Sequence, residues 1–215
     1  MSISTAKMAA ALGGAGAVGT GGYFAVKSLP NTPVSIKDSL LKEEYELISE
    51  ITDKNKREEQ YKKTFALYKS ESGFLQEVNK HSEGNANISD SDDGEKGKVA
   101  LEKLCASYLE STDSKLLENS QKWCVLRIID KELINKEWIV SGTGNQDSDW
   151  KSSFTKNKDL LVSLNIEGIS SGTDQNAGHS LVKKWCETNT KLIINKGNKD
   201  TLANASQVCS KDKVN

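Results

Sequence analysis

Four cysteines in the second half of the chain constrain its fold more than any other feature. They are Cys105, Cys124, Cys186 and Cys209. The turn-forming segment 111–114 lies near the midpoint of the first two, and 197–198 lies at the midpoint of the last two. In an antiparallel helix pair, residues equidistant from the turn face each other. This geometry favours the disulfides Cys105–Cys124 and Cys186–Cys209 among the three connectivities that four cysteines allow.

The segments 101–124 and 181–209 repeat one pattern. Each begins with a leucine shortly before its first cysteine and ends at its second cysteine. In the first segment, apolar residues follow helical spacing in both arms. The two segments therefore predict two disulfide-linked helical hairpins.

Two other uses of the cysteines are less consistent with the sequence. A zinc site requires short ligand loops such as C-x-x-C, which the chain lacks, and neither His81 nor His179 pairs with a cysteine at finger spacing. In a cytoplasmic protein the cysteines would be buried thiols. An even number behind an export-type leader indicates disulfides instead. We expect no metal.

A glycine motif near the start resembles a dinucleotide-binding loop but lacks its context. Gly14, Gly16 and Gly19 match G-x-G-x-x-G. That loop follows a buried strand and opens a helix. Here the preceding residues are small, and the prolines at 30 and 33 end any helix after a few turns. The motif predicts no cofactor.

Residues 8–26 contain no charged side chain. As a helix they would span about 28 Å, close to the roughly 30 Å hydrocarbon core of a bilayer. Three interpretations compete: an uncleaved membrane anchor, a cleaved export signal with an A-x-A-like site at 15–17, and a flexible leader of small residues. We favour the anchor, with the body of the protein outside the cell.

The sequence as a whole predicts a mainly α protein in three parts. These are a membrane-directed segment with its linker (1–30), a helical region that ends in an acidic loop (31–97), and the cysteine-containing helical domain (98–215). The loop contains "DSDDG", but a calcium loop aligned on Gly94 would place serines and an alanine at ligand positions.

Apolar spacing predicts individual helices. A helix is expected from Ile36 through Ile51 with Asp38 as its cap, followed by one with an aromatic stripe at 61, 65 and 68. A further helix begins at Trp150, with Asp149 as its cap. We expect the tryptophans at 123, 138, 150 and 185 to form the core of the second half.

Composition and motifs exclude several classes of function. A net charge of −1 argues against nucleic-acid binding. The chain contains no G-x-S-x-G, H-E-x-x-H or P-loop motif. His179 is interpreted as a solvated or capping residue near a helix start. We expect no catalytic and no cofactor-binding residues.

The layout resembles a known group of proteins. The Gly/Ala-rich uncharged leader, the lysine-rich and arginine-poor body and the repeated "KWC" at 122–124 and 184–186 are similar to the uncharacterised paralogous protein families of haemotropic mycoplasmas. This resemblance implies an exported protein, an antigen or adhesin at the host-cell surface. The first and last cysteines lack the adjacent tryptophan.

These observations predict a membrane-anchored surface or exported protein that contacts a host protein or cell surface, or presents variable epitopes, without catalysis. The alternative is a membrane-tethered enzyme or small-ligand-binding protein on the same leader. The exposed faces, dense in Lys, Glu, Asn and Ser, favour the first.

Overall fold

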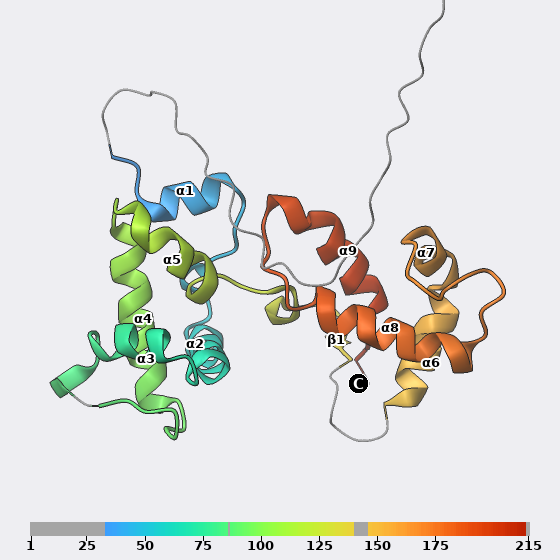
Figure 1. Ribbon diagram of the computed structural model, residues 1–215, viewed down its shortest axis with the longest axis horizontal. Helices are drawn as coiled ribbons and strands as arrows, with labels where there is room; N and C mark the ends of the chain where they lie inside the picture. The colour runs from blue at the N-terminus through green and yellow to red at the C-terminus, as the bar shows by residue number, and fades with distance from the viewer. Residues whose placement is uncertain (1–32, 86, 140–145, 214–215) are drawn as a thin grey trace, which may run out of the picture. The chain divides into compact units, whose positions relative to one another are not determined.

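Helices make up most of residues 33–85, 87–139 and 146–213, which are the residues that the computed structural model describes (Figure 1). They belong to one compact unit. The helices of its first half are α1 (Ile36–Lys42), α2 (Lys54–Tyr68), α3 (Ser72–Asn79), α4 (Glu95–Glu110) and α5 (Leu117–Trp123). Those of its second half are α6 (Asp147–Lys156), α7 (Lys158–Ser163), α8 (Gln175–Asn189) and α9 (Lys199–Val208). The mainly α prediction is therefore confirmed for these residues, and the predicted membrane-directed segment lies outside them.

Short elements connect the helices. The single 3₁₀ turns are η1 (Ile48–Glu50), η2 (Glu83–Asn85), η3 (Ser114–Leu116), η4 (Ile128–Asp130) and η5 (Lys196–Asn198). Two strands, β1 (Lys136–Trp138) and β2 (Ser210–Asp212), pair in antiparallel register with Trp138 opposite Ser210. The segment 124–142, whose sequence suits both helix and strand, thus contains a 3₁₀ turn and a strand.

The first helix is shorter than its apolar spacing predicts. It ends at Lys42, and Glu44 then takes a left-handed backbone conformation with φ 58. Ser35, and not Asp38, is the N-cap, because its Oγ accepts a hydrogen bond of 3.0 Å from the Asp38 N–H. Leu47 lies beyond the turn and forms a β-bridge instead of a helical turn.

The aromatic stripe of the second helix is as predicted. Tyr61 and Phe65 on α2 are fully buried, and Tyr68 is half-buried. Phe65 and Tyr68 both pack against the ring of Phe74 on α3, with centroids 5.9 and 5.8 Å away. Burial of these rings holds α2 and α3 against α4.

The tryptophan predictions hold in part. Trp123 and Trp150 are buried, whereas Trp138 and Trp185 are half-buried at the edge of the core. Asp149 is not the cap of α6, which begins after Gln146. Its carboxylate lies in the first turn instead, where it accepts a hydrogen bond of 2.9 Å from Lys211 Nζ and interacts favourably with the helix dipole.

Both predicted disulfides are present. Cys105 on α4 is bonded to Cys124 directly after α5, and Cys186 on α8 to Cys209 directly after α9. The Cα–Cα distances are 5.5 and 5.6 Å. Each bond closes one helical hairpin, as the centred turns predict.

The backbone around these hairpins follows one plan twice. In each half a residue with φ 58 lies three positions before a β-pairing. Glu44 precedes Leu47, which bridges to Val125 directly after Cys124. Asn135 precedes Trp138, which pairs with Ser210 directly after Cys209. The next residue then binds the carbonyl of that cysteine: Ile48 N–H donates to Cys124 O at 3.0 Å, and Ile139 N–H to Cys209 O at 2.9 Å. We call residues 36–126 the first copy and residues 127–211 the second copy.

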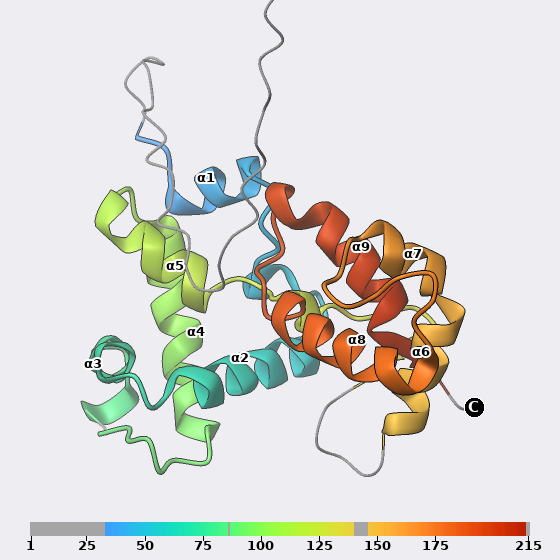
Figure 2. The same cartoon turned by 45° about the vertical axis from the view of Figure 1, so that its right-hand side comes forward.

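Side-chain packing repeats in the same places. The stretch "YKKTF" (61–65) on α2 corresponds to "WKSSF" (150–154) on α6. In the first copy Phe65 lies against Gly97 of α4, and in the second Phe154 lies against Gly178 of α8. Each of these glycines precedes the first cysteine of its hairpin by eight residues. Figure 2 shows α2 against α4 and α6 against α8, the helix pairs that these contacts join.

Candidate functional site

The four cysteines, the site residues that the sequence predicts, have a structural role. Each cysteine is at most 2% exposed, and each bond lies inside its own hairpin. Trp123, next to Cys124, packs its ring against Phe74 with the centroids 5.1 Å apart and an angle of 69° between the ring planes. A bond this enclosed is poorly accessible to an external thiol, so these disulfides stabilise the fold and do not exchange with substrates.

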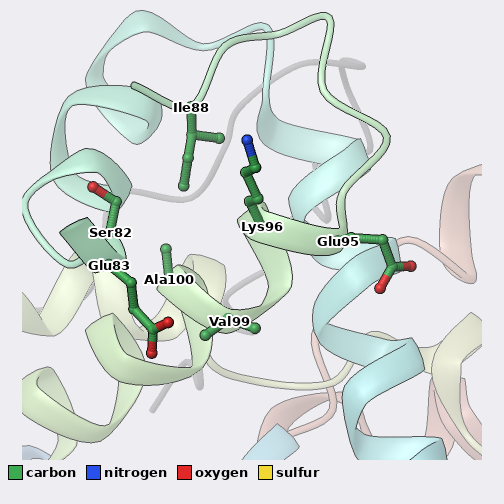
Figure 3. A pocket seen from close by; sticks show the side chains of 7 residues that line it. All are labelled: Ser82, Glu83, Ile88, Glu95, Lys96, Val99 and Ala100. Atoms are coloured by element: carbon green, nitrogen blue, oxygen red, sulfur yellow. The ribbon is translucent and has the colours of Figure 1, made fainter. Parts of the chain in front are cut away.

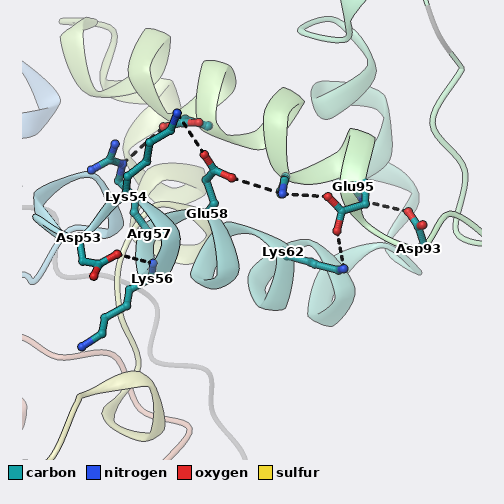
Figure 4. Close-up of polar contacts among 10 residues, drawn as sticks. Asp53, Lys54, Lys56, Arg57, Glu58, Lys62, Asp93 and Glu95 are labelled. Atoms are coloured by element: carbon teal, nitrogen blue, oxygen red, sulfur yellow. Dashed lines mark hydrogen bonds and ion pairs between the residues drawn. The ribbon is translucent and has the colours of Figure 1, made fainter.

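An ion-pair network joins α2 to α4 on the surface of the first copy. Glu95 accepts hydrogen bonds from Lys62 Nζ at 2.5 Å and is paired with Lys98 Nζ at 2.8 Å. Lys98 also approaches Glu58, which lies one turn after Lys54 on α2. Figure 4 shows these contacts running along the facing sides of the two helices. The network stabilises the contact between α2 and α4. Each of its carboxylates is paired with a lysine, so none is free to act in catalysis.

Glu95 gives the network a measurable pH dependence. Hydrogen bonds from Lys62 and then Lys98 lower the pKa of Glu95 to about 2. A carboxylate whose folded pKa lies below its unfolded value, about 4.3, stabilises the fold above that value, and the contribution is lost as the pH falls toward 2. In the Glu95→Gln variant, we therefore expect reduced stability at pH 7 and a difference from wild type that shrinks between pH 5 and pH 2.

Urea unfolding at several pH values measures this difference. The double variant Lys62→Gln/Glu95→Gln serves as the control. Without Lys62, replacing Glu95 by Gln should lower the free energy of unfolding by less than it does in the wild-type background. A difference that stays constant from pH 7 to pH 2 would contradict the assignment.

A cavity of about 380 Å³ lies between the start of α4 and the loop before it. Figure 3 shows Ile88, Val99 and Ala100 around it, with Lys96 at its edge and the carboxylate of Glu95 directed away. Glu83 at the other edge is paired with Lys103 at 2.6 Å. The cavity thus offers an apolar surface with one cationic group.

Ser82 in this cavity is not set up as a nucleophile. Its Oγ donates a hydrogen bond of 2.9 Å to Asn79 O at the end of α3. A serine nucleophile needs a neighbouring base that accepts its proton. Among the residues lining the cavity, Glu83 is engaged by Lys103 and no histidine is present.

A second, more open groove of about 610 Å³ lies between α9 and the loop that precedes β1. Leu133 and Ile134 on the loop face Leu202 and Ala203 on α9. Ile134 is 88% exposed, the largest exposed fraction among the exposed large hydrophobic residues. Ile134 thus extends the small apolar surface of this groove to its rim.

His179, Arg57 and Arg127 each make contacts with residues close to them in the sequence. His179 on α8 is partly exposed, and its Nδ1 lies 3.0 Å from Gln175 O in the preceding turn. Arg57 Nη1 donates a hydrogen bond of 2.8 Å to Ile51 O. Arg127 binds the two carboxylate oxygens of Asp130 with Nε and Nη2, at 2.8 and 2.9 Å. All three stabilise local backbone, and neither cavity described above includes His179.

No cluster of His, Cys, Asp and Glu side chains within residues 33–85, 87–139 and 146–213 could hold a metal ion. Within the same ranges, each helix is too short or too polar to cross a bilayer. The predicted anchor at residues 8–26 lies outside these ranges.

Comparisons with protein-family models, with curated proteins and with solved structures gave no match.

Proposed function

We propose that this chain is a surface or exported interaction protein, held at the membrane by residues 8–26, whose body contacts host molecules or presents variable epitopes. The two disulfides carry the proposal. Disulfides of this structural kind form and persist in oxidising compartments and are rare in the reducing cytosol. With cysteine pairs 19 and 23 residues apart, each bond stabilises the fold substantially by restricting the unfolded chain.

The surface chemistry supports a contact role. Many ion pairs among the described residues join exposed lysines to exposed carboxylates, as in Lys56–Glu132 and Lys37–Glu50. Exposed pairs of this kind typically contribute about 0–1 kcal/mol. Such positions can change with little loss of stability, which suits a protein that presents variable epitopes.

The alternative, a small-ligand-binding protein on the same leader, is supported by one observation. The cavity beside Ile88, Val99 and Ala100 has a volume in the range of ligand pockets. Its polar groups at the edge are few, and Glu83 among them is already paired. We therefore rank this function second.

Protease shaving of intact cells tests the proposal. We expect trypsin added outside the cells to release peptides from the body, starting at exposed lysines such as Lys54 and Lys80. A known cytoplasmic protein and a known surface protein of the same cells are the controls. A body that stays intact while the surface control is digested would exclude the proposed location.

A further inference from the structure

The two copies differ in how the outer face of their last helix is covered. In the first copy, α1 packs against α4 and α5. Ile36 and Leu40, one helical turn apart on α1, are buried. Directly after α1, Tyr45 Oη accepts a hydrogen bond of 3.1 Å from Gln121 Nε2 on α5. A short amphipathic helix and the tyrosine after it thus cover this side of α5.

The second copy has no such helix in the corresponding place. Glu44 and Asn135, the residues with φ 58, are equivalent. Eight positions before them lie Ile36 and Arg127, and four positions before them lie Leu40 and Lys131. The helix itself is reduced to the single turn η4. Arg127 is paired with Asp130 and Lys131 with Glu46, so neither side chain supplies an apolar contact to α9 in place of the missing helix.

The uncovered side of α9 is the groove described above. Aligning the second cysteines of the hairpins places Leu202 and Ser206 of the groove at the positions of Leu117 and Gln121 on α5. Lys136, which takes the position of Tyr45, also lines the groove. The open side of α9 therefore corresponds to the side of α5 that α1 and its flanking tyrosine cover in the first copy.

We propose that this groove binds a short amphipathic helix of another protein, with two apolar residues one turn apart and an acidic flank. The apolar residues would pack against Leu133, Ile134 and Leu202, as Ile36 and Leu40 pack in the first copy. Helices that bind grooves commonly present apolar residues at this spacing.

The charges at the rim determine the character of the flank. Lys136 has no ion-pair partner within the described ranges, and Lys156 has only Asp212, at 3.7 Å and with both side chains mostly exposed. Glu132, on the same rim, is paired with Lys56 at 2.7 Å. Two lysines are therefore available to acidic residues of the incoming helix, which steers its approach and favours one orientation.

This inference deepens the proposed function by naming its contact surface, and it rests on that function for the partner being another protein. The probe is a fluorescein-labelled peptide with the sequence of residues 33–46, "PVSIKDSLLKEEYE", which reproduces α1 and Tyr45 and carries a net negative charge. Fluorescence anisotropy measures its binding to the full-length, oxidised protein in mild detergent. We expect saturable binding.

The test variant is Ile134→Glu. It places in the groove the residue that the first copy has at the equivalent position, Glu43, and a side chain 88% exposed can be replaced without disturbing the core. Removing one buried apolar contact and adding a charge should weaken binding about tenfold or more. The matched control is Leu67→Glu on α2, another exposed apolar residue, 47% exposed and away from the groove, for which we expect affinity within about twofold of wild type.

Three results would overturn the proposal. They are the absence of saturable binding, equal affinity in wild type and Ile134→Glu, and a self-association in sedimentation experiments that the peptide dissociates. The second would mean that the peptide exchanges with α1 on α5, and the third that α1 of a second copy is the occupant. Because the titration uses purified protein, its failure is distinguishable from a failure of the shaving experiment, which tests location alone.

Discussion

Removal of the Cys186–Cys209 disulfide by the double variant Cys186→Ala/Cys209→Ala is expected to lower the free energy of unfolding by about 3 kcal/mol. The bond joins residues 23 apart in the chain, and cutting it restores the freedom of that loop in the unfolded state. A loss of this size is a large share of the stability of a domain, which is typically about 5–15 kcal/mol. Equilibrium unfolding in urea measures the change.

The other hairpin provides the matched comparison. The variant Cys105→Ala/Cys124→Ala opens a loop of 19 residues, so its expected loss is nearly the same. Wild-type protein fully reduced with a phosphine should give a lower midpoint than either double variant, because it lacks both bonds. If either double variant unfolds at the wild-type midpoint, then that bond does not restrict the unfolded chain as the entropic account requires.

Gly178→Ala is expected to destabilise the protein by about 2–3 kcal/mol. The added Cβ would lie 2.1 Å from the ring of Phe154, which is buried and cannot move aside without displacing α6. The corresponding change in the first copy, Gly97→Ala, would place its Cβ 2.5 Å from Phe65 and should have a similar effect. Thermal and urea unfolding of both variants measure these losses.

Gly73→Ala is the control for this pair. Gly73 lies in α3, and a Cβ there would meet nothing within 4 Å. Since alanine has a higher helix propensity than glycine, this variant should be as stable as wild type or more stable by roughly 0.5–1 kcal/mol. Similar losses in all three variants would show that the close helix contacts are not the cause.

The hairpins could be predicted because their information is local. A turn between two cysteines and helical spacing on either side fix the pairing of Cys105 with Cys124 without reference to the rest of the chain. The end of α1 was not predictable in this way. Leu47 is buried and continues the apolar spacing, but it is buried as a bridge to Val125, 78 positions later in the chain.

The full extent of the repeat was missed for a related reason. The stretches 61–65 and 150–154 have side chains of similar size and type but few identical residues. The offset between equivalent residues also changes along the chain. It is 91 at the turn with φ 58, 89 at the aromatic helix, 81 at the glycine and 85 at the second cysteine. Loops of different length cause these changes, so a search at one fixed period fails. The aromatic-Lys-x-[Thr/Ser]-Phe pattern was the available signal.

The groove beside α9 could not be predicted from the sequence at all. Its lining residues, such as Leu202 and Ala203, are unremarkable members of an amphipathic helix. What makes them a surface is the absence of an α1 equivalent from the second copy, and this becomes apparent only when the two copies are compared in space.

The repeated packing plan also determines how this protein can diverge. In each copy a few positions meet strict demands: two cysteines, one glycine, the phenylalanine that packs against this glycine, and a buried aromatic residue one turn before the phenylalanine. The positions around them differ freely, and the connecting loops have already changed length. Most surface residues can therefore be substituted while the backbone fold is retained. Proteins descended from one gene would then share a fold without detectable sequence similarity.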